Sequence, residues 1–384
     1  MKMRAAVMYE QGKPTPYAES RPLVVEEVEL DGPGPGELLV EIVAAGLCHS
    51  DLSAIAGLRP RAVPTVVGHE SCGIVREVGP GVTEFKVGDH VVMVFVASCG
   101  HCDHCYGGRP NLCEASWVAR SKGTLQSGAR RLHKGDLVLN HWTGISCFAE
   151  YAVVSQNSLV KIDPDIPLED AAAFGCAVIT GVGAVVNTAK VPLGSSVAVV
   201  GLGGVGLSAL LGARAAGAGR IVAIDVSDDK LRLARELGAT HAFNARDPKC
   251  VEMVRDATSG GVAYAFEMSS VMAGVATAYA VLRRGGLVVV ASLPDAKATF
   301  PLPVQAMVSD ERGIIGSYMG SCVPKRDVPR FIDLYRQGRL PINRLRSGTV
   351  TLDEINEGFD RLARGETVRD ILVFNKTQAQ SKGK

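Results

Sequence analysis

The stretch from Ser195 to Ser227 constrains the fold of this 384-residue chain more than any other. It runs as an apolar strand, a glycine-rich turn, a helix of small residues and a second apolar strand. Apolar strands that alternate with helices indicate a parallel sheet covered on both faces. Further apolar runs follow at residues 263–268 and 287–294, so we expect residues 179–316 to form one doubly wound α/β domain.

The turn inside this stretch has the spacing GxGxxG, at Gly201, Gly203 and Gly206. Between a strand and a helix, this spacing predicts a dinucleotide site. The first glycine permits the tight turn, the second lets the backbone approach a pyrophosphate, and the third lets the helix pack on the strand. The helix N-terminus favours the anion. The alternative is a glycine cluster that serves helix packing alone.

Asp225 closes the following strand, where it would accept hydrogen bonds from both ribose hydroxyls of an adenosine. A 2′-phosphate there would meet a like charge, so the sequence favours NAD over NADP. Lys230 follows five residues later and is either a ribose contact or a solvated helix lysine. The expected cofactor residues of this region are therefore Gly201, Gly203, Gly204, Val205, Gly206, Asp225 and Lys230.

Residues 1–165 have a different character, with short β-type segments separated by turns. We expect a mostly β domain over residues 1–178, completed by residues 317–384, which contain two amphipathic helices and a last strand. Residues 114–146 are polar and contain glycine, which predicts a long loop or a pair of loops.

Residues 46–70 collect polar side chains of metal-site type: Cys48, His49, Ser50, Asp51, His69 and Glu70. Cysteine and histidine are zinc ligands, and a catalytic zinc needs three protein ligands and one open position. Because His49 adjoins Cys48 and can point elsewhere, the rest of the chain has to supply a further ligand.

A second cluster lies in residues 96–114, where the spacing C-x2-C-x2-C-x7-C places Cys99, Cys102, Cys105 and Cys113 within 15 residues. Four thiolates at this spacing predict a closed structural zinc site. A redox or disulfide cluster is the alternative. His101 and His104 lie between the cysteines, and we expect them to be solvated because four thiolates already fill a tetrahedron.

The overall charge excludes some classes of partner. Lys plus Arg is 41 and Asp plus Glu is 40, a balance that argues against nucleic acid as a partner. No apolar run reaches the roughly 20 residues that span a bilayer, so we expect no membrane association. The first residues show no apolar signal segment, so a cytoplasmic location is expected, where the ten cysteines would serve metal binding more than disulfides.

The segment GHESCGIVREVGPGV, residues 68–82, matches the GHExxGxxxxxGxxV signature of zinc-containing medium-chain alcohol dehydrogenases. The four-cysteine segment, the GLGGVG turn and Cys-x-Ser-Asp at residues 48–51 occur in that family's order. The chain therefore resembles this family from about residue 5 to residue 375. The resemblance implies a GroES-like catalytic domain with a small, partly open β-barrel, a Rossmann domain, and an active site in the cleft between them.

The resemblance also implies an activity: reversible, NAD-dependent oxidation of an alcohol to an aldehyde or ketone, with two zinc ions per subunit. By the family's pattern Cys48, His69 and Cys176 are the catalytic zinc ligands. Asp51 orients the His69 ring, and Ser50 removes the alcohol proton.

The resemblance also bears on the roles of four further residues, and for most of them an alternative role remains. Glu70 either replaces the metal-bound water transiently or forms a buried ion pair with an arginine such as Arg369. Arg369 itself matches a pyrophosphate contact, with a surface arginine as the alternative. His49 matches a basic residue on the cofactor pyrophosphate. Ser53 stands where the best-known members have a histidine that passes the proton to solvent. The route by which the proton reaches solvent is therefore not assigned, and a water chain or His49 are the candidates.

The substrate is less constrained. Phe95 and Trp142 match pocket-wall positions, and Arg59 a position at the pocket mouth, which favours apolar or aromatic primary alcohols and, by charge alone, a distal carboxylate. In glutathione-dependent formaldehyde dehydrogenases an acidic residue and an arginine hold the glutathione. Arg59 and Trp117 stand at the matching positions here, which argues against such adducts.

The long segment 114–146 resembles dimeric family members, so a homodimer is expected. Three other functions stay open. The chain could be a nicotinoprotein that keeps its NAD and uses another electron acceptor, a formaldehyde or glutathione-adduct dehydrogenase, or a zinc-stabilised binding protein without activity.

Overall fold

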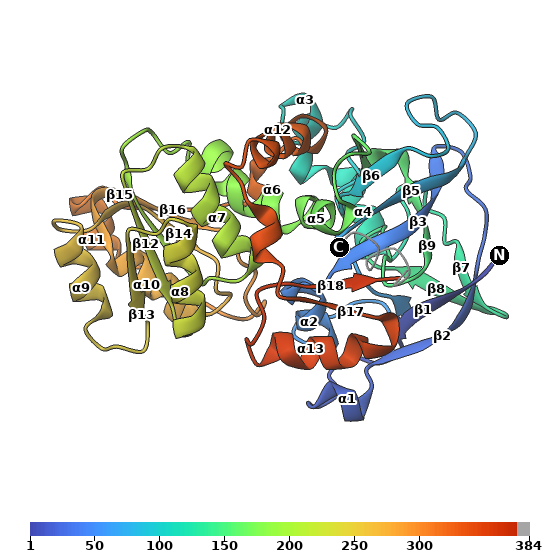
Figure 1. Ribbon diagram of the computed structural model, residues 1–384, viewed down its shortest axis with the longest axis horizontal. Coiled ribbons are helices and arrows are strands. Elements are labelled where there is room, and N and C mark those ends of the chain that lie inside the picture. The colour runs from blue at the N-terminus through green and yellow to red at the C-terminus, as the bar shows by residue number, and fades with distance from the viewer. Residues whose placement is uncertain (375–384) are drawn as a thin grey trace, which may run out of the picture. The chain divides into compact units, whose positions relative to one another are not determined.

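The computed structural model describes residues 1–374 and divides into two compact units (Figure 1). The first unit comprises Met1–Cys176, Val323–Pro329 and the residues from Arg346 onward. The second comprises Ala177–Cys322 and Arg330–Leu345. Compared with the expected domains, the tail is shared between the units. The last ten residues of the expected range 317–384 lie outside the described part.

Hydrogen bonds explain why parts of the tail belong to the second unit. The thiol of Cys322 donates to the backbone oxygen of Ile179 over 3.2 Å, and Ser317 and Thr188 join their hydroxyl groups over 2.8 Å. Arg339 donates to the backbone oxygen of Ala215 over 2.8 Å. We expected all of residues 317–384 to complete the first domain. Residues 317–322 and Arg330–Leu345 instead pack in the second unit.

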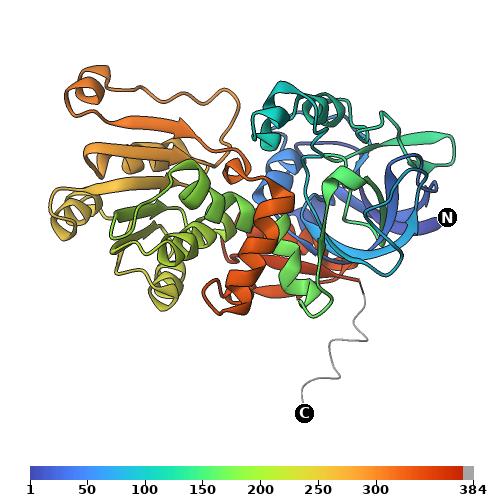
Figure 2. The ribbon, with the colours of Figure 1, turned by 90° about the horizontal axis from the view of Figure 1, so that it is seen from above.

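The second unit is built on a six-stranded sheet whose strands all pair in parallel. The strand order is β13 (His241–Asn244), β12 (Arg220–Asp225), β11 (Ser196–Val200), β14 (Val262–Glu267), β15 (Leu282–Val290) and β16 (Gly313–Gly316). The connecting helices are α7 (Gly204–Ala215), α8 (Asp228–Leu237), α9 (Cys250–Ala257), α10 (Met272–Ala280) and α11 (Val304–Ser309), and they lie on both faces (Figure 2). The strand order reverses between β11 and β14, as in dinucleotide-binding folds. The expected doubly wound sheet is confirmed.

Small residues let two helices of this unit approach closely. Helix α6 (Ala177–Gly183), followed by a wide helical turn (Ala184–Thr188), packs on α7. A Cβ on Gly181 would lie 2.3 Å from the backbone oxygen of Val205, and one on Gly212 would lie 3.0 Å from the Cα of Val182. Among residues 1–374 no single helix is long and apolar enough to cross a membrane. Leu168–Gly175 and Ala177–Thr188 meet that test only as a bent pair.

The first unit combines a closed barrel with a seven-stranded sheet. The barrel runs β1 (Lys2–Met8), β2 (Leu23–Leu30), β7 (Leu132–Lys134), β8 (Leu137–His141) and β4 (Thr65–Val66), which pairs again with β1. The sheet runs β10 (Leu159–Ile162), β6 (His90–Met93), β5 (Ser71–Val78), β3 (Glu37–Gly46), β18 (Asp370–Val373) and β17 (Gly348–Val350), with β9 (Tyr151–Ser155) also on β3. The barrel is closed, and not partly open as expected, because β4 bridges β1 and β8.

The C-terminal strand completes the first unit. β18 pairs antiparallel with β3, where Leu372 faces Ala45, so the ends of the described chain lie in one unit (Figures 1 and 2). The sheet core is continuous with α2 (His49–Ile55) and α13 (Ile355–Ala363) through fully buried side chains such as Phe148 and Phe359. This core supports the polar segment that begins at Cys48, directly after β3.

Residues 114–146 are more structured than a loop, so that expectation is wrong. They contain α4 (Glu114–Ser121) and the β7–β8 hairpin, which turns at Gly135 with φ +57°. The sequence shows no apolar pattern for these elements, because α4 buries little of its surface and the two strands are short. The remaining helices are the long α12 (Pro324–Arg336) and the short α1 (Tyr17–Ser20), α3 (Asp103–Tyr106) and α5 (Leu168–Ala171). Residues 1–374 also contain seven 3-10 or wide turns, among them Pro110–Leu112, Ala172–Gly175 and Leu352–Glu354.

Candidate metal and cofactor sites

Three side chains from separate segments of the first unit meet in what we call the Cys–His–Cys cluster: Cys48, His69 and Cys176. One ligand atom from each lies within 4.8 Å of the others, and Sγ of Cys176 is 3.4 Å from Nε2 of His69. All three side chains are buried. Cys48 immediately precedes α2, and His69 lies between β4 and β5.

Cys176 reaches the cluster because a helical run is interrupted. Residues 169–189 have the apolar pattern of one helix, but Cys176 has φ −141° and ψ −70° and separates the turn Ala172–Gly175 from α6. A Cβ on Gly175 would lie 2.1 Å from the backbone oxygen of Met93, so only glycine fits against β6 here. The break and this close approach bring the thiol of Cys176 to the imidazole of His69.

The second nitrogen of His69 is held by Asp51. Nδ1 lies 2.8 Å from Oδ1 of Asp51, whose side chain is fully buried, so Nδ1–H donates to the carboxylate and Nε2 faces the two thiols. Burial raises the pKa of Asp51, while His69 and the indole N–H of Trp142 lower it. Within the described residues Oδ2 of Asp51 and Nε1 of Trp142 lack an aligned hydrogen bond, although the indole is near enough to act on this pKa.

The two thiols of the cluster differ in acidity because they share a hydrogen bond. The bond from Cys176 lowers the pKa of Cys48 well below that of an ordinary thiol, and the same bond raises the pKa of Cys176. Burial opposes the first shift and adds to the second. A group of two sulfurs and one neutral ring nitrogen is the donor set of a catalytic zinc with an open fourth position, so the residues fit that metal.

Glu70 forms the buried ion pair that was one of its two sequence interpretations. Its Oε1 accepts from Nη1 of Arg369 over 2.6 Å, and both side chains are buried. Burial raises the pKa of Glu70 to about 7, against the opposing charge of Arg369. Gly46 leaves room for the pair, because a Cβ there would lie 2.4 Å from Oε1. The roles of Glu70 beside a metal and of Arg369 on a pyrophosphate stay predictions.

The hydroxyl and imidazole groups after Cys48 lie on the first turn of α2. Ser50 is partly exposed and His49 is exposed. Ser53 donates its hydroxyl to the backbone oxygen of His49 over 2.7 Å. This bond occupies the hydroxyl proton of Ser53, where the resemblance led us to expect a relay histidine. The roles expected for Ser50 and His49 remain predictions.

The residues expected to form the pocket lie in different surroundings. The ring of Phe95 meets the ring of His69 edge-on, with centroids 5.4 Å apart. Trp142 is buried, and its indole is close enough to Asp51 to lower the pKa of that carboxyl group. Gln11 donates to the backbone oxygen of Arg59 over 3.0 Å, which anchors the loop that follows α2. Arg120 of α4, which the sequence did not single out, has its guanidinium carbon 5.8 Å from the centroid of the Phe95 ring.

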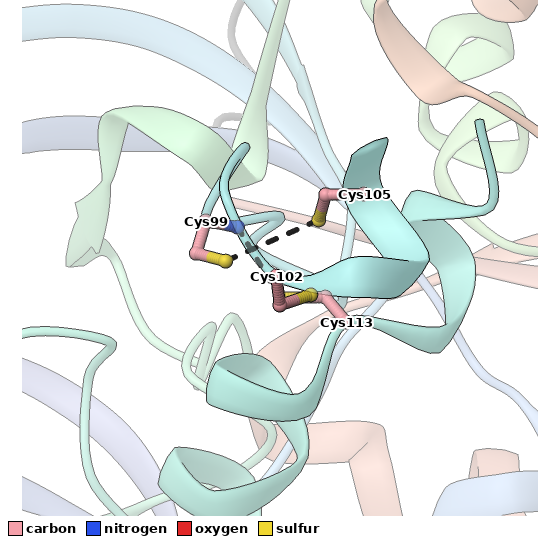
Figure 3. Close-up of side chains that lie close together, drawn as sticks. All are labelled: Cys99, Cys102, Cys105 and Cys113. Atoms are coloured by element: carbon pink, nitrogen blue, oxygen red, sulfur yellow. Dashed lines mark hydrogen bonds between the residues drawn. The ribbon is translucent and has the colours of Figure 1, made fainter. Parts of the chain in front are cut away.

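The four cysteines of residues 96–114, which we call the four-cysteine lobe, converge in Figure 3. Their sulfur atoms all lie within 4.8 Å of one another, and Sγ of Cys99 is 4.0 Å from Sγ of Cys105. Cys113 is buried and the other three are partly exposed. His101 bonds the backbone oxygen of Cys99 and His104 approaches Glu114, so neither imidazole takes a cysteine's place in the group. Four thiols fit a closed zinc site.

The glycine turn of the second unit fits a dinucleotide. Gly201 has φ +90°, and a Cβ on it would lie 2.7 Å from the backbone nitrogen of Ser269. A Cβ on Gly206 would lie 1.8 Å from the backbone oxygen of Gly201, whereas none of the described atoms lies within 4 Å of that position on Gly203. The open side at Gly203 is where a phosphate could approach the N-terminus of α7, which Gly204 and Val205 begin.

Asp225 is anchored at the end of β12. Its Oδ2 accepts from the backbone N–H of Leu202 over 2.6 Å and its Oδ1 from that of Ser227 over 2.9 Å. The carboxylate therefore ties the glycine turn to the next strand. Lys230 follows in the first turn of α8, where its backbone N–H is capped by Ser227.

Comparisons with known proteins agree with both units. Residues 34–164 match the family described as alcohol dehydrogenase GroES-like domain, and residues 204–337 match the family described as zinc-binding dehydrogenase. An NDMA-dependent alcohol dehydrogenase from Amycolatopsis methanolica is 38% identical over 380 residues, which cover 98% of this chain and 100% of the relative.

Two further proteins are similar over nearly their whole length. An S-(hydroxymethyl)glutathione dehydrogenase from Paracoccus denitrificans is 35% identical over 387 residues, covering 97% of this chain and 100% of the relative. The crystal structure of benzyl alcohol dehydrogenase from Acinetobacter calcoaceticus has a TM-score of 0.91 and 33% identity, covering 98% of this chain and 100% of that one.

Proposed function

Since the chain belongs to the zinc-containing alcohol dehydrogenase family of medium-chain dehydrogenases/reductases, we propose that it oxidises an apolar or aromatic primary alcohol with NAD. The product is the aldehyde, and the reaction is reversible. The observation that carries the proposal is the Cys–His–Cys cluster, in which Asp51 fixes the His69 tautomer that leaves Nε2 toward the two sulfurs.

The residues of the cluster would hold a zinc ion, and zinc bound there lowers the pKa of an alcohol at its open position. Cys48 and Cys176 offer two thiolates and His69 a neutral imidazole, which together balance the charge of the metal. Asp51 keeps the His69 ring in place. Ser50 lies two residues after Cys48 on the partly exposed first turn of α2, where it takes the alcohol proton. The four-cysteine lobe would hold a second zinc ion in each chain.

NAD is proposed as the cofactor because of the glycine turn and Asp225. Gly203 leaves room for the pyrophosphate at the start of α7, and the Asp225 carboxylate would face the adenosine ribose. His49 and Arg369 are the proposed basic contacts to the pyrophosphate, and Lys230 a contact to the ribose. A 2′-phosphate would meet the charge of Asp225, so NADP should bind more weakly.

A rate measurement with defined alcohols tests the proposal. The purified chain, loaded with zinc, is assayed for nicotinamide reduction with benzyl alcohol and short aliphatic alcohols, each with NAD and with NADP. We expect turnover of benzyl alcohol with NAD. Ser50→Ala should lower kcat about a hundredfold with zinc content unchanged, and Ser50→Thr, which keeps a hydroxyl, should retain most of the rate. Absence of turnover with every alcohol would contradict the proposal.

Two alternatives within the family are favoured by the names of relatives. An NDMA-dependent relative supports a nicotinoprotein, which would keep its cofactor through extensive dialysis and need an added electron acceptor. A relative that acts on S-(hydroxymethyl)glutathione supports a glutathione-adduct dehydrogenase. For that second alternative, formaldehyde oxidation would have to depend on glutathione.

A homodimer is the proposed assembly. β16 is the edge strand of the parallel sheet, and exposed apolar side chains lie on it and on the preceding helix: Ile315, Val304 and Val308. An edge strand with apolar neighbours is suited to pairing with a second copy. Sedimentation should give twice 40.4 kDa, and Val308→Asp should shift the mass toward a single chain.

A further inference from the structure

One buried carboxylate of the second unit has no role in the sites described above. Glu267 is the last residue of β14, and its side chain is fully buried. Among residues 1–374 no ion pair includes Glu267, and the side chains that donate to it are those of two serines. A carboxylate is seldom buried without a cation beside it. The bonds that Glu267 makes should therefore show why it is there.

The two oxygens of Glu267 join the segments that follow two neighbouring strands. Oε1 accepts from the backbone N–H of Ser269 over 2.7 Å and from the Ser269 hydroxyl over 2.5 Å. Oε2 accepts from the hydroxyl of Ser292, two residues beyond the end of β15. Because β14 and β15 pair in parallel, both segments leave the sheet at its carboxyl edge. Glu267 therefore fixes the segment after β14 to the segment after β15.

The first of these segments also touches the glycine turn. The backbone nitrogen of Ser269 lies 2.7 Å from the position of a Cβ on Gly201. The backbone N–H of Met268 donates to the oxygen of Val200, the last residue of β11, over 2.8 Å. This bond holds Met268 against β11 without help from Glu267. Loss of the carboxylate should thus leave the turn in place and release the residues beyond Met268.

The order of the strands indicates which half of a dinucleotide these segments face. Dinucleotides bind across the carboxyl edge where the strand order reverses, which is between β11 and β14 in this sheet. Asp225 ends β12 on one side of β11 and is the proposed contact to the adenosine ribose. The proposed pyrophosphate site is the glycine turn after β11. The nicotinamide half is then expected on the other side of β11, toward β14 and β15.

Resting on the proposed function, we propose that Glu267 is a positioning residue for the nicotinamide half of the cofactor. It acts through Ser269 and Ser292, whose segments it fixes beside the switch point of the sheet. Segments that are ordered before the cofactor arrives lose less conformational entropy when it binds, so its affinity is higher. The adenosine half depends on Asp225 and on the start of α7, and so it should not depend on Glu267.

A whole cofactor and a fragment of it test this role in the zinc-loaded full chain. NADH carries both halves, whereas ADP carries only the adenosine and its two phosphates, and calorimetry measures the Kd of each. Glu267→Gln keeps the size of the side chain but replaces one accepting oxygen with an N–H donor. We expect this variant to bind NADH about tenfold more weakly, the effect of one lost hydrogen bond to a charged group. Its Kd for ADP should stay within about twofold.

Two further variants show whether the effect belongs to this network. Ser292→Ala removes a single donor from a partly exposed position, so it should fold and weaken NADH binding about threefold, with ADP unchanged. Thr258→Val is the matched control. It removes a buried hydroxyl of the same unit, which donates to the backbone oxygen of Val254 over 2.6 Å at the end of α9. Both affinities should be unchanged in this control, even if its stability falls.

The ratio of the two dissociation constants decides the outcome. Equal weakening of NADH and ADP in Glu267→Gln would overturn the proposal, as would an unchanged affinity for NADH. If Glu267→Gln does not fold, Ser292→Ala decides, and an unchanged ratio in that variant overturns the proposal. An unaltered chain that binds neither compound would contradict the proposed cofactor and this inference together. If both compounds bind but no alcohol is oxidised, the proposed function fails, while the role of Glu267 is still judged by the ratio.

Discussion

The Cys–His–Cys cluster and the four-cysteine lobe offer similar donor atoms, yet the chain holds them in different ways. His69 and Cys176 are 107 positions apart, whereas Cys99 and Cys113 are 14 apart. The cluster is buried throughout, and three of the four lobe cysteines are partly exposed. The lobe can assemble from its own short segment, but the cluster exists only when the β core and the break before α6 are in place.

Their surroundings differ as well. Buried charges support the cluster: Asp51 on His69 and the Glu70–Arg369 pair beside Gly46. The lobe has solvent-exposed neighbours such as the side chains of His104 and Glu114. A buried site that depends on distant segments is thus coupled to the free energy of the whole unit, whereas a local site stabilises chiefly its own segment. Four variants test whether the two sites depend on the fold in these different ways, and the first has the largest expected effect.

The largest effect is expected from Cys176→Ala. Loss of one of three ligands should lower kcat/KM about a thousandfold or more, and zinc should fall from two ions to one per chain. Cys72→Ala removes an equally buried thiol from β5 of the same unit and should keep both zinc ions. Elemental analysis with steady-state rates measures this. Retention of two zinc ions in Cys176→Ala would show that the cluster is no metal site.

Arg369→Met should destabilise the first unit, because it leaves Glu70 buried without its partner. Removing one member of a buried pair costs about 3–5 kcal/mol in the free energy of unfolding, as urea titration would measure. The double variant with Glu70→Gln removes both charges and should recover much of that loss. A double variant as unstable as the single one would mean that packing, and not charge, is what Arg369 contributes.

Cys105→Ser tests the lobe. Zinc should fall from two ions to one, since metal binding energy is folding energy. The free energy of unfolding should fall by about 3 kcal/mol, the stabilisation given by a ligand at roughly a hundred times its Kd. Turnover per remaining folded chain should stay within about tenfold, because the cluster is built from other segments. If this variant loses the cluster's zinc as well, the two sites are not independent and the comparison fails.

The smallest effect concerns the acid stability contributed by His141, the last residue of the barrel strand β8. Burial lowers the pKa of His141 to about 3, helped by the charges of Arg130, Arg131 and His133. Between pH 3 and 6.5 the unfolded chain binds a proton that the folded chain refuses, so stability falls as the pH falls through this range. At pH 5 the cost is about 2 kcal/mol.

His141→Gln removes the titration and offers an amide oxygen to the backbone N–H of Arg131, which now donates to Nε2 over 3.0 Å. Urea titrations at pH 7 and pH 5 should therefore show a weaker pH dependence than in the unaltered chain. The measurement separates acid unfolding of the barrel from acid release of zinc. An unchanged pH dependence would assign acid sensitivity to the metal sites or to other groups.

Short-range patterns predicted much of this molecule. The spacing of Gly201, Gly203 and Gly206 indicated the turn, because each steric requirement is local. The four-cysteine spacing indicated a group that does converge, since a short segment can bring its own thiols together. The parallel sheet followed from apolar strands that alternate with helices.

Long-range relations were less accessible. Cys176 was identified through family resemblance, because the helical break that positions it depends on Gly175 meeting β6. The approach of the Trp142 indole to Asp51 joins two segments 91 positions apart and has no local signal, and the pocket-wall role of Trp142 stays a prediction. The contact of Arg120 with Phe95 joins two segments whose approach no local spacing encodes. The shared tail, Val323–Pro329 in one unit and Arg330–Leu345 in the other, also has no compositional signal.

Three of the four cysteines in the four-cysteine lobe are partly exposed, and this affects how long the purified protein stays intact. Sγ of Cys99 and Sγ of Cys105 are 4.0 Å apart. Once the metal is removed, an oxidant such as dissolved oxygen can convert this pair of thiols into a disulfide. Removal of zinc by a chelator without oxidant is then reversible. Removal of zinc in air leads to disulfides between the lobe cysteines, which can no longer bind the metal. Storage with a thiol reductant and trace zinc should preserve the protein, and ageing should begin at the lobe while the buried cluster is still intact.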